Sequence, residues 1–173
     1  MSHPHILLTA PPRTGKTTVI RRLAELLREA GVPVRGFVSD EIREHGHRVG
    51  FTIEEFDGEK AVMAHVSWVS GPRVGQYGVN VLEFERIALP AMERALTTKG
   101  AVALIDEIGP MELLSPAFMP RCVTLFAADV PVVATIHQRS RPALKSRVDA
   151  ELITVTAQNR DELPRTLSRL LSA

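Results

Sequence analysis

The chain has 173 residues, enough for one compact domain that buries about two thirds of its unfolded surface, so residues 1–173 are expected to form a single domain. Its 21 basic and 20 acidic residues are spread along the chain and give a formal net charge of +1, which argues against a face for duplex nucleic acid or an anionic membrane. Cys122 is the only cysteine and is expected in the core, which excludes an internal disulfide. No apolar run is long enough for a signal peptide or a membrane span, so a cytoplasmic location is expected.

The first predicted element is a short buried strand at residues 5–9, and the loop after it carries the most informative motif. Its sequence, Ala10-Pro11-Pro12-Arg13-Thr14-Gly15-Lys16-Thr17, matches the phosphate-binding pattern of P-loop nucleotide hydrolases, with alanine in place of the first glycine. A helix is predicted from Thr17 to Ala30, and Gly31 and Pro33 end it. Its apolar face consists of Ile20, Leu23, Leu27 and Ala30. This order of elements brings backbone N–H groups and the positive end of a helix together, so it predicts binding of a nucleoside triphosphate.

The polar residues of this motif have separate expected tasks. Lys16 is expected to reach the β and γ phosphates, and the hydroxyl of Thr17 is expected to ligate the Mg²⁺ that bridges them. Gly15 allows the backbone to approach the phosphates closely.

An antiparallel meander is predicted next. The β-rich runs 34–42 and 49–56 are separated by a polar, glycine-containing turn, and the run 61–66 follows a second turn signal. His45 and His47 lie in the first turn without metal-ligand spacing on a helix, so they are expected to be solvated rather than bound to zinc.

The stretch 70–78 contains many helix breakers and is expected to be an irregular surface loop. Trp68, just before this stretch, and Tyr77, within it, stack on a base or serve as packing groups. A helix is predicted from Asn80 toward residues 99–100, and Pro90 is expected to kink or divide it. Its apolar residues are Leu82, Ile87, Ala91 and Leu96.

The apolar run 101–105 ends in Asp106-Glu107 and predicts a parallel strand buried on both faces. In open α/β sheets, ligands bind beyond the carboxyl ends of the strands, which is also the edge that the P-loop leaves. Asp106 is therefore expected to hold Mg²⁺ through water, and Glu107 to orient or deprotonate a water in line with the γ phosphate. The alternatives are a turn cap for Asp106 and a surface ion pair for Glu107.

Two further strands are predicted at 130–136 and 152–156, and a helix from Asp161 to Leu171. Its expected apolar face consists of Leu163, Leu167 and Leu170. Thr135 hydrogen-bonds the γ phosphate or its water, or is an ordinary strand-end residue. This alternation of strands and helices indicates an α/β fold with a parallel core.

Several segments, in order and spacing, closely resemble the cancer-related nucleoside triphosphatase family over nearly the whole chain. They are residues 5–18, 36–43, 48–51, 74–79, 105–113 and 159–161. The resemblance implies a RecA-like P-loop fold, a three-layer sandwich with a mainly parallel sheet and a meander insertion. It also implies Mg²⁺-dependent hydrolysis of ATP, GTP, CTP and UTP to diphosphate and phosphate with little base discrimination, and it makes Glu107 the carboxylate that activates water. The residues it assigns to nucleotide binding are Ala10, Pro11, Pro12, Arg13, Thr14, Gly15, Lys16, Thr17, Thr18, Ala103, Leu104, Ile105, Asp106, Glu107, Ile108, Gly109 and Pro110.

The chain departs from the family pattern at Ala10 and Arg13, where glycine is usual. Arginine at a position of positive φ costs about 1 kcal/mol or more relative to glycine. Alternatively, Arg13 lies over the triphosphate and supplies positive charge in cis. Asn159-Arg160-Asp161 edges the base or caps a helix.

Two other functions fit parts of the same sequence. A nucleotide or nucleoside kinase would use the meander and the Tyr77 loop to hold an acceptor hydroxyl, and a nucleotide-switched module would use slow hydrolysis as a timer on RNA or protein. A glutamate directly after Asp106 favours water as the acceptor. We expect a monomer, and any trans-acting arginine would come from Arg43, Arg73, Arg139 or Arg141.

Overall fold

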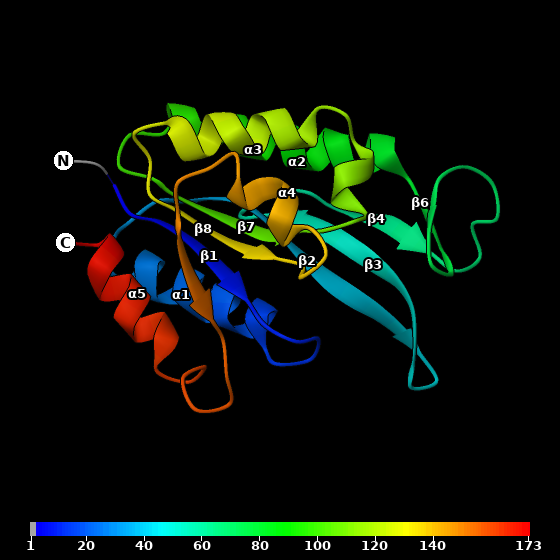
Figure 1. The fold of residues 1–173 in the computed structure, drawn as a ribbon, viewed down its shortest axis with the longest axis horizontal. Helices are drawn as coiled ribbons and strands as arrows, with labels where there is room; N and C mark the ends of the chain where they lie inside the picture. The colour runs from blue at the N-terminus through cyan, green and yellow to red at the C-terminus, as the bar shows by residue number, and fades with distance from the viewer. Residues whose placement is uncertain (1–2) are drawn as a thin grey trace.

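A nine-stranded mixed sheet runs through the middle of the computed structural model, which describes residues 3–173 (Figure 1). Its strand order is β5-β6-β4-β3-β2-β7-β8-β1-β9, and the pairs from β2 to β9 are parallel while those from β5 to β2 are antiparallel. The strands are β1 (His5–Thr9), β2 (Val34–Glu44), β3 (His47–Glu55), β4 (Lys60–His65), β5 (Arg73–Val74), β6 (Tyr77–Val79), β7 (Val102–Ile108), β8 (Val132–Ile136) and β9 (Glu151–Thr154). The expected α/β fold, with a parallel core and an antiparallel meander, is confirmed.

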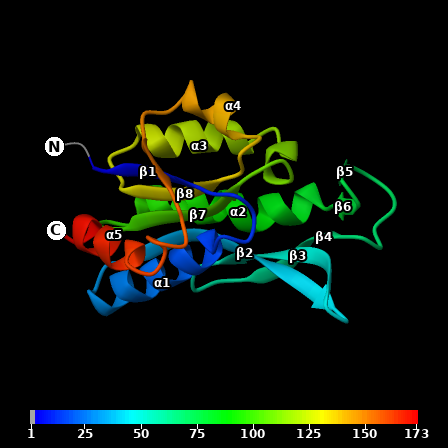
Figure 2. The ribbon, with the colours of Figure 1, turned by 60° about the horizontal axis from the view of Figure 1, so that its bottom comes forward.

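Helices cover both faces of this sheet and make the three layers (Figures 1 and 2). The helices are α1 (Lys16–Glu29), α2 (Val81–Thr97), the 3₁₀ turn η1 (Glu112–Leu114), α3 (Phe118–Ala127), α4 (Arg141–Lys145) and α5 (Leu163–Leu171). Helices α1 and α5 lie side by side on one face, and α2 and α3 lie on the other. The central strands alternate accordingly: in β7, Val102 and Leu104 pack toward α1 and α5, whereas Ala103 and Ile105 pack toward α2 and α3.

The carboxyl ends of β1 and β7 lie at the same edge of the sheet, because both strands pair in parallel with β8 between them. Leu8 of β1 lies beside Thr135, and Ile105 of β7 lies beside Ala134. Strand β7 continues three residues beyond the predicted end at Ile105, and its pairing with β8 is irregular between Ile105 and Ile108. The carboxylates therefore sit in an irregular section of the strand.

The segment 70–78 matches its prediction as an irregular surface loop only in part, because residues 70–73, 75 and 76 are exposed while the rest of the segment is not. It contains β5 and β6, and Tyr77, Gly78 and Val79 are buried. Val79 pairs with Ala64 of β4, and Tyr77 packs edge-to-face on Phe51, with ring centroids 5.1 Å apart. Most of the glycine and proline residues of this segment lie around its two short strands, and the apolar residues Tyr77 and Val79 pack into the core.

Two helix predictions also need correction. Helix α2 begins as predicted, with the Asn80 side chain accepting a 3.1 Å hydrogen bond from the Glu83 N–H, but Pro90 does not divide it. Packing of Ile87 and Ala91 on the sheet outweighs the one hydrogen bond that proline removes. Leu82 and Leu170, predicted on apolar faces, are exposed, and Leu171 takes the buried place at the end of α5.

Cys122 is buried in α3, as expected. Within residues 3–173, no helix combines the length and the apolar character needed to cross a bilayer.

Candidate active site

The P-loop connects β1 to α1 and closes on itself. The Thr14 hydroxyl donates a 2.7 Å hydrogen bond to the carbonyl of Pro11. Gly15 has a φ of 99° at the N-cap of α1, a left-handed conformation that glycine adopts without strain. The first turn of α1 carries no acidic side chain, so its free N–H groups and positive end are open to an anion.

Arg13 also has a positive φ, 65°, and its side chain is exposed. The structure confirms the positive φ considered for this residue: an arginine occupies a conformation that favours glycine. Arg13 nevertheless lines the cleft beside Lys16, so its charge faces the same space.

Asp106 is buried beside the P-loop, with 2% of its surface exposed. Thr135 donates a 2.6 Å hydrogen bond to Oδ1 of Asp106, while Oδ2 is buried and has no hydrogen-bond partner within residues 3–173. Burial raises the pKa of Asp106 to about 6; the nearby Glu107 charge adds to this, and the hydroxyls of Thr135 and Thr17 oppose it. A carboxylate oxygen buried without a partner is costly unless a cation meets it.

Glu107 is half-buried and meets the P-loop lysine. The Nζ atom of Lys16 lies 3.8 Å from Oε2 of Glu107 and donates a 3.5 Å hydrogen bond to the carbonyl of Ile136 at the end of β8. Burial raises the pKa of Glu107 above its ordinary value, and the positive charge of Lys16 opposes that rise. The structure thus brings the predicted lysine and the predicted carboxylate together.

Glu112, in η1, is a third carboxyl that the sequence analysis did not single out. A Cβ atom placed on Gly109 would lie 2.8 Å from Oε1 of Glu112 and 3.1 Å from Oε1 of Glu107, so both carboxyl groups pass close over this glycine. Burial and then the charges of Glu107 and Asp106 raise the pKa of Glu112 well above its usual range, so this carboxyl binds a proton more readily than an exposed glutamate does. The sequence does contain one signal for a buried carboxyl here, because Glu112 stands between the apolar residues Met111 and Leu113, five residues after Glu107.

These groups share one cleft of about 720 Å³. Besides the P-loop and the carboxylates, it is lined by the β2–β3 hairpin, the β5–β6 turn and the residues after β8. The expected nucleotide-binding residues that line it are Ala10, Pro12, Arg13, Thr14, Gly15, Lys16, Thr17, Thr18, Asp106, Glu107 and Pro110. Ala103, Leu104, Ile105 and Ile108 are buried inside β7 instead.

Three other candidates have partners within the protein. Thr135 directs its hydroxyl to Asp106 rather than to the cleft. Asn159 caps a turn, accepting a hydrogen bond from the Thr156 N–H, and does not cap α5, which begins at Leu163. Its neighbour Arg160 reaches back to the P-loop and donates a 3.5 Å hydrogen bond to the carbonyl of Thr14.

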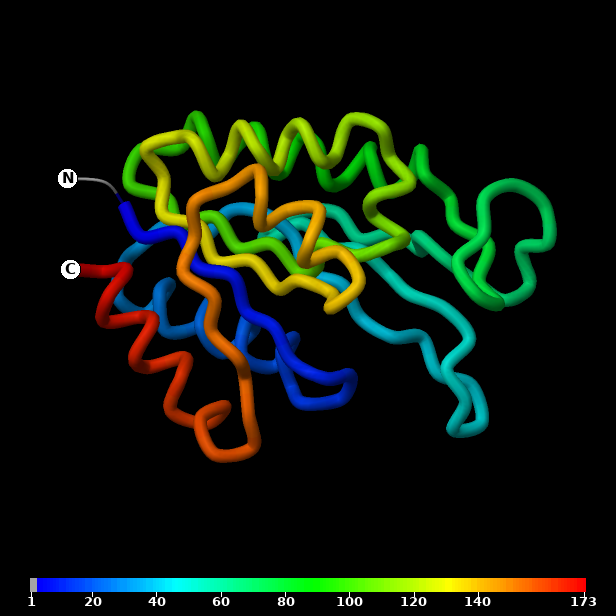
Figure 3. The backbone as a smooth tube through the Cα atoms, in the orientation of Figure 1, coloured from blue at the N-terminus to red at the C-terminus, as the bar shows by residue number. Residues whose placement is uncertain are grey.

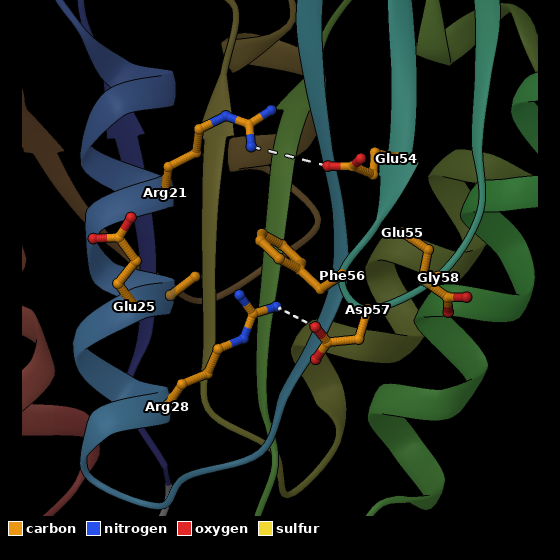
Figure 4. Close-up of a pocket in the computed structure, with 9 residues that line it drawn as sticks. Arg21, Glu25, Arg28, Glu54, Glu55, Phe56, Asp57 and Gly58 are labelled. Atoms are coloured by element: carbon orange, nitrogen blue, oxygen red, sulfur yellow. Dashed lines mark hydrogen bonds and ion pairs between the residues drawn. The ribbon is translucent and has the colours of Figure 1, made fainter.

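A separate groove of about 350 Å³ lies between α1 and the β3–β4 turn (Figure 4). Arg28 pairs with Asp57 at 3.1 Å, and its guanidinium lies 5.6 Å from the ring centroid of Phe56. Arg21 pairs with Glu54 at 3.9 Å and with Asp40. Because these charged side chains pair with one another, their ion pairs connect α1 to the meander.

The fold and the site define a P-loop nucleoside triphosphatase. A sequence model of the family described as NTPase matches residues 5–168, and the chain belongs to this family, which includes the cancer-related nucleoside triphosphatases. The chain is 44% identical over 179 residues to nucleoside-triphosphatase THEP1 of Thermofilum pendens, covering 100% of this chain and 98% of that protein. It is 36% identical over 174 residues to the human cancer-related nucleoside-triphosphatase, covering 92% of each. The crystal structure of THEP1 from the hyperthermophile Aquifex aeolicus superposes with a TM-score of 0.84 at 35% identity, covering 98% of this chain and 99% of that one.

Proposed function

We propose that the protein hydrolyses nucleoside triphosphates to diphosphate and phosphate, that hydrolysis depends on Mg²⁺, and that the base contributes little to recognition. The observation that carries this is the convergence of the P-loop, Asp106 and Glu107 in one cleft. Most of the polar groups that we assign to substrate binding contact the phosphates and not the base. No Asn-Lys-x-Asp guanine reader occurs in the sequence, and the side chain of Asn159 bonds to the backbone of its own turn, which supports low base specificity.

The residues present suit a divalent cation. Among the residues that the structure describes, Oδ2 of Asp106 is a buried carboxylate oxygen without a hydrogen-bond partner, and the hydroxyl of Thr17 acts on the same carboxyl group. Mg²⁺ prefers such oxygen ligands and usually retains several waters. We assign Thr17 and Asp106 to hold it, and when bound it offsets charge on the β and γ phosphates.

The chain's own residues position the phosphates and the attacking water. The N–H groups at the start of α1 and the Lys16 ammonium bind the β and γ phosphates. Glu107, on the neighbouring strand tip, orients a water opposite the scissile bond and accepts its proton. The raised pKa of Glu107 makes it a better base than an exposed glutamate. Thr135 positions Asp106 through its 2.6 Å hydrogen bond.

We further propose that residues 1–173 work as one domain and as a monomer in the cytoplasm. One continuous sheet with a core on each face fits a single domain, and the single buried cysteine fits a reducing compartment.

Phosphate release from ATP, GTP, CTP and UTP, measured with and without Mg²⁺ and without any added acceptor, tests this proposal. We expect release from all four with similar kcat/KM values and a loss of release when Mg²⁺ is chelated. A kinase would be nearly silent without an acceptor, and a module with a slow timer would need a partner for appreciable turnover. Either result would reject the proposal.

A further inference from the structure

The cleft continues past the P-loop and the carboxylates into a space that the proposed hydrolysis does not use. We call it the hairpin compartment and define it by Glu41, Arg43, Arg48, Phe51, Val74 and Tyr77, all of which line the cleft. These residues come from the β2–β3 hairpin and from β5–β6, which lie on the side of the molecule away from both termini (Figure 3). Hydrolysis by water requires none of them.

Arg48 is held in this compartment by several contacts. Its Nε donates a 2.9 Å hydrogen bond to the hydroxyl of Tyr77, and its Nη1 donates a 3.1 Å hydrogen bond to Oε1 of Glu41. The guanidinium carbon lies 5.2 Å from the ring centroid of Phe51 and 5.7 Å from that of Tyr77. Arginine has five N–H donors, and Nη2 has no partner within residues 3–173, so a fixed cation retains free donors.

The charges here do not cancel. Burial works to raise the pKa of Glu41, but hydrogen bonds from Arg48 and Arg43 outweigh it and lower the pKa, so Glu41 is ionised. Arg43 pairs with the same carboxylate, with Nη2 2.8 Å from Oε2. One carboxylate against two guanidinium groups leaves one net positive charge.

Apolar surface lies next to this charge. Phe51 and Val74 are half-buried and line the cleft together with half-buried Met111. Ligand sites commonly combine such an apolar lining with a few oriented polar groups. A simple inorganic anion would use only the cation, and an uncharged apolar molecule would use only the apolar side chains. A ligand that carries both groups would use the whole compartment.

We propose that the hairpin compartment binds a second small molecule beside the nucleotide, in which an oxyanion, phosphate or carboxylate, is attached to a planar apolar body. The free N–H groups of Arg48 donate to the oxyanion, since guanidinium matches phosphate and carboxylate geometry. Phe51, Val74 and Met111 cover the body. This binding activity is additional to the proposed hydrolysis. The second molecule would lie in the same cleft as the γ phosphate.

The test measures binding of phenyl phosphate, and separately of benzoate, to the full chain saturated with Mg²⁺ and a non-hydrolysable ATP analogue, by titration calorimetry. Phenol serves as the uncharged control. We expect saturable binding of phenyl phosphate or benzoate, and the comparison shows which oxyanion is preferred. Binding of both probes no better than that of phenol would overturn the proposal.

Variants locate the binding. Arg48→Met is expected to weaken binding of the preferred probe at least tenfold, and Arg94→Met, which removes an arginine paired with Glu55 outside the cleft, is expected to leave it unchanged. Tyr77→Phe retains the ring and removes only the hydroxyl that orients Arg48, so it keeps the proposal testable if Arg48→Met unfolds. Unchanged binding in a folded Arg48→Met, or in Tyr77→Phe if Arg48→Met does not fold, would overturn the proposal, as would competition between the probe and the ATP analogue. Because the analogue is not hydrolysed, these outcomes do not depend on turnover.

Discussion

The Nζ atom of Lys16 lies 3.8 Å from Oε2 of Glu107, so the P-loop cation and the carboxylate assigned to water activation face each other across the cleft. In the function proposed above, a γ phosphate bound by Lys16 competes with Glu107 for the same ammonium group. Its binding therefore weakens this ion pair and leaves the carboxylate free to accept a hydrogen bond from water. Substrate binding and the preparation of the base are linked through these two side chains.

Lys16→Ala is expected to weaken nucleotide binding about tenfold to a hundredfold, because it removes a charge-assisted hydrogen bond worth about 1.5–3 kcal/mol. Titration with a non-hydrolysable ATP analogue measures the loss directly. Lys145→Ala, in α4 outside the cleft, is the matched control and should bind like the parent chain. Parental affinity in Lys16→Ala would show that the ammonium group does not contact the phosphates.

Arg13→Gly is expected to leave hydrolysis intact and to leave stability unchanged or slightly raised. Relief of the positive φ gains about 1–2 kcal/mol. The greater freedom of glycine in the unfolded chain offsets about 0.5–1 kcal/mol of that. His45→Gly, at another positive φ outside the cleft, is a control for the backbone effect. Phosphate release reduced more than about tenfold, or about 1.4 kcal/mol, would instead assign Arg13 a catalytic charge.

Asp106→Asn is expected to stabilise the metal-free protein at pH 8. The pKa of Asp106 in the folded state is raised from 3.8 to about 6, so folded Asp106 keeps its proton to a higher pH than the unfolded chain does. Stability present below pH 4 is therefore lost as the pH rises to about 6, by on the order of 3 kcal/mol. Asparagine removes this dependence.

Chemical denaturation in the presence of a chelator, at pH 5 and pH 8, measures the effect. A variant less stable than the parent at pH 8 would contradict it. With Mg²⁺ and nucleotide present the order should reverse, because only the parent gains stability from the bound metal.

Glu112→Gln is expected to preserve turnover within about threefold, because the raised pKa of Glu112 favours the neutral carboxyl, whose shape glutamine shares. Glu112→Ala should destabilise the protein by about 2–3 kcal/mol through the cavity it leaves. Thermal unfolding and phosphate release measure both variants. A loss of turnover beyond tenfold in a stable Glu112→Gln protein would show that the carboxyl must exchange a proton.

The parallel core and the catalytic edge could be predicted because their signals are local. The strand before the P-loop and the one carrying Asp106 are continuous apolar runs, and parallel pairing places their carboxyl ends at one edge. The positions of Lys16 and Glu107 follow from that placement.

The remainder depends on packing between distant segments. Tyr77 lies in a glycine-rich stretch, and its burial comes from contacts with distant residues such as Phe51 and Arg48. A glutamate at position 112 would ordinarily be expected at the surface. Its place beside Glu107 depends on Gly109, over which both carboxyl groups pass. Pro90 predicts a kink or a division, and the core residues on either side of it keep α2 undivided.

The most direct test compares Glu107→Gln with the parent chain for both nucleotide affinity and phosphate release under saturating Mg²⁺ and ATP. Glu25→Gln, on the exposed surface of α1, serves as a control for the loss of a carboxylate. We predict an affinity within about twofold of the parent and a turnover reduced at least about a hundredfold, the range expected for loss of a general base. Turnover at the parental rate in Glu107→Gln would contradict the account.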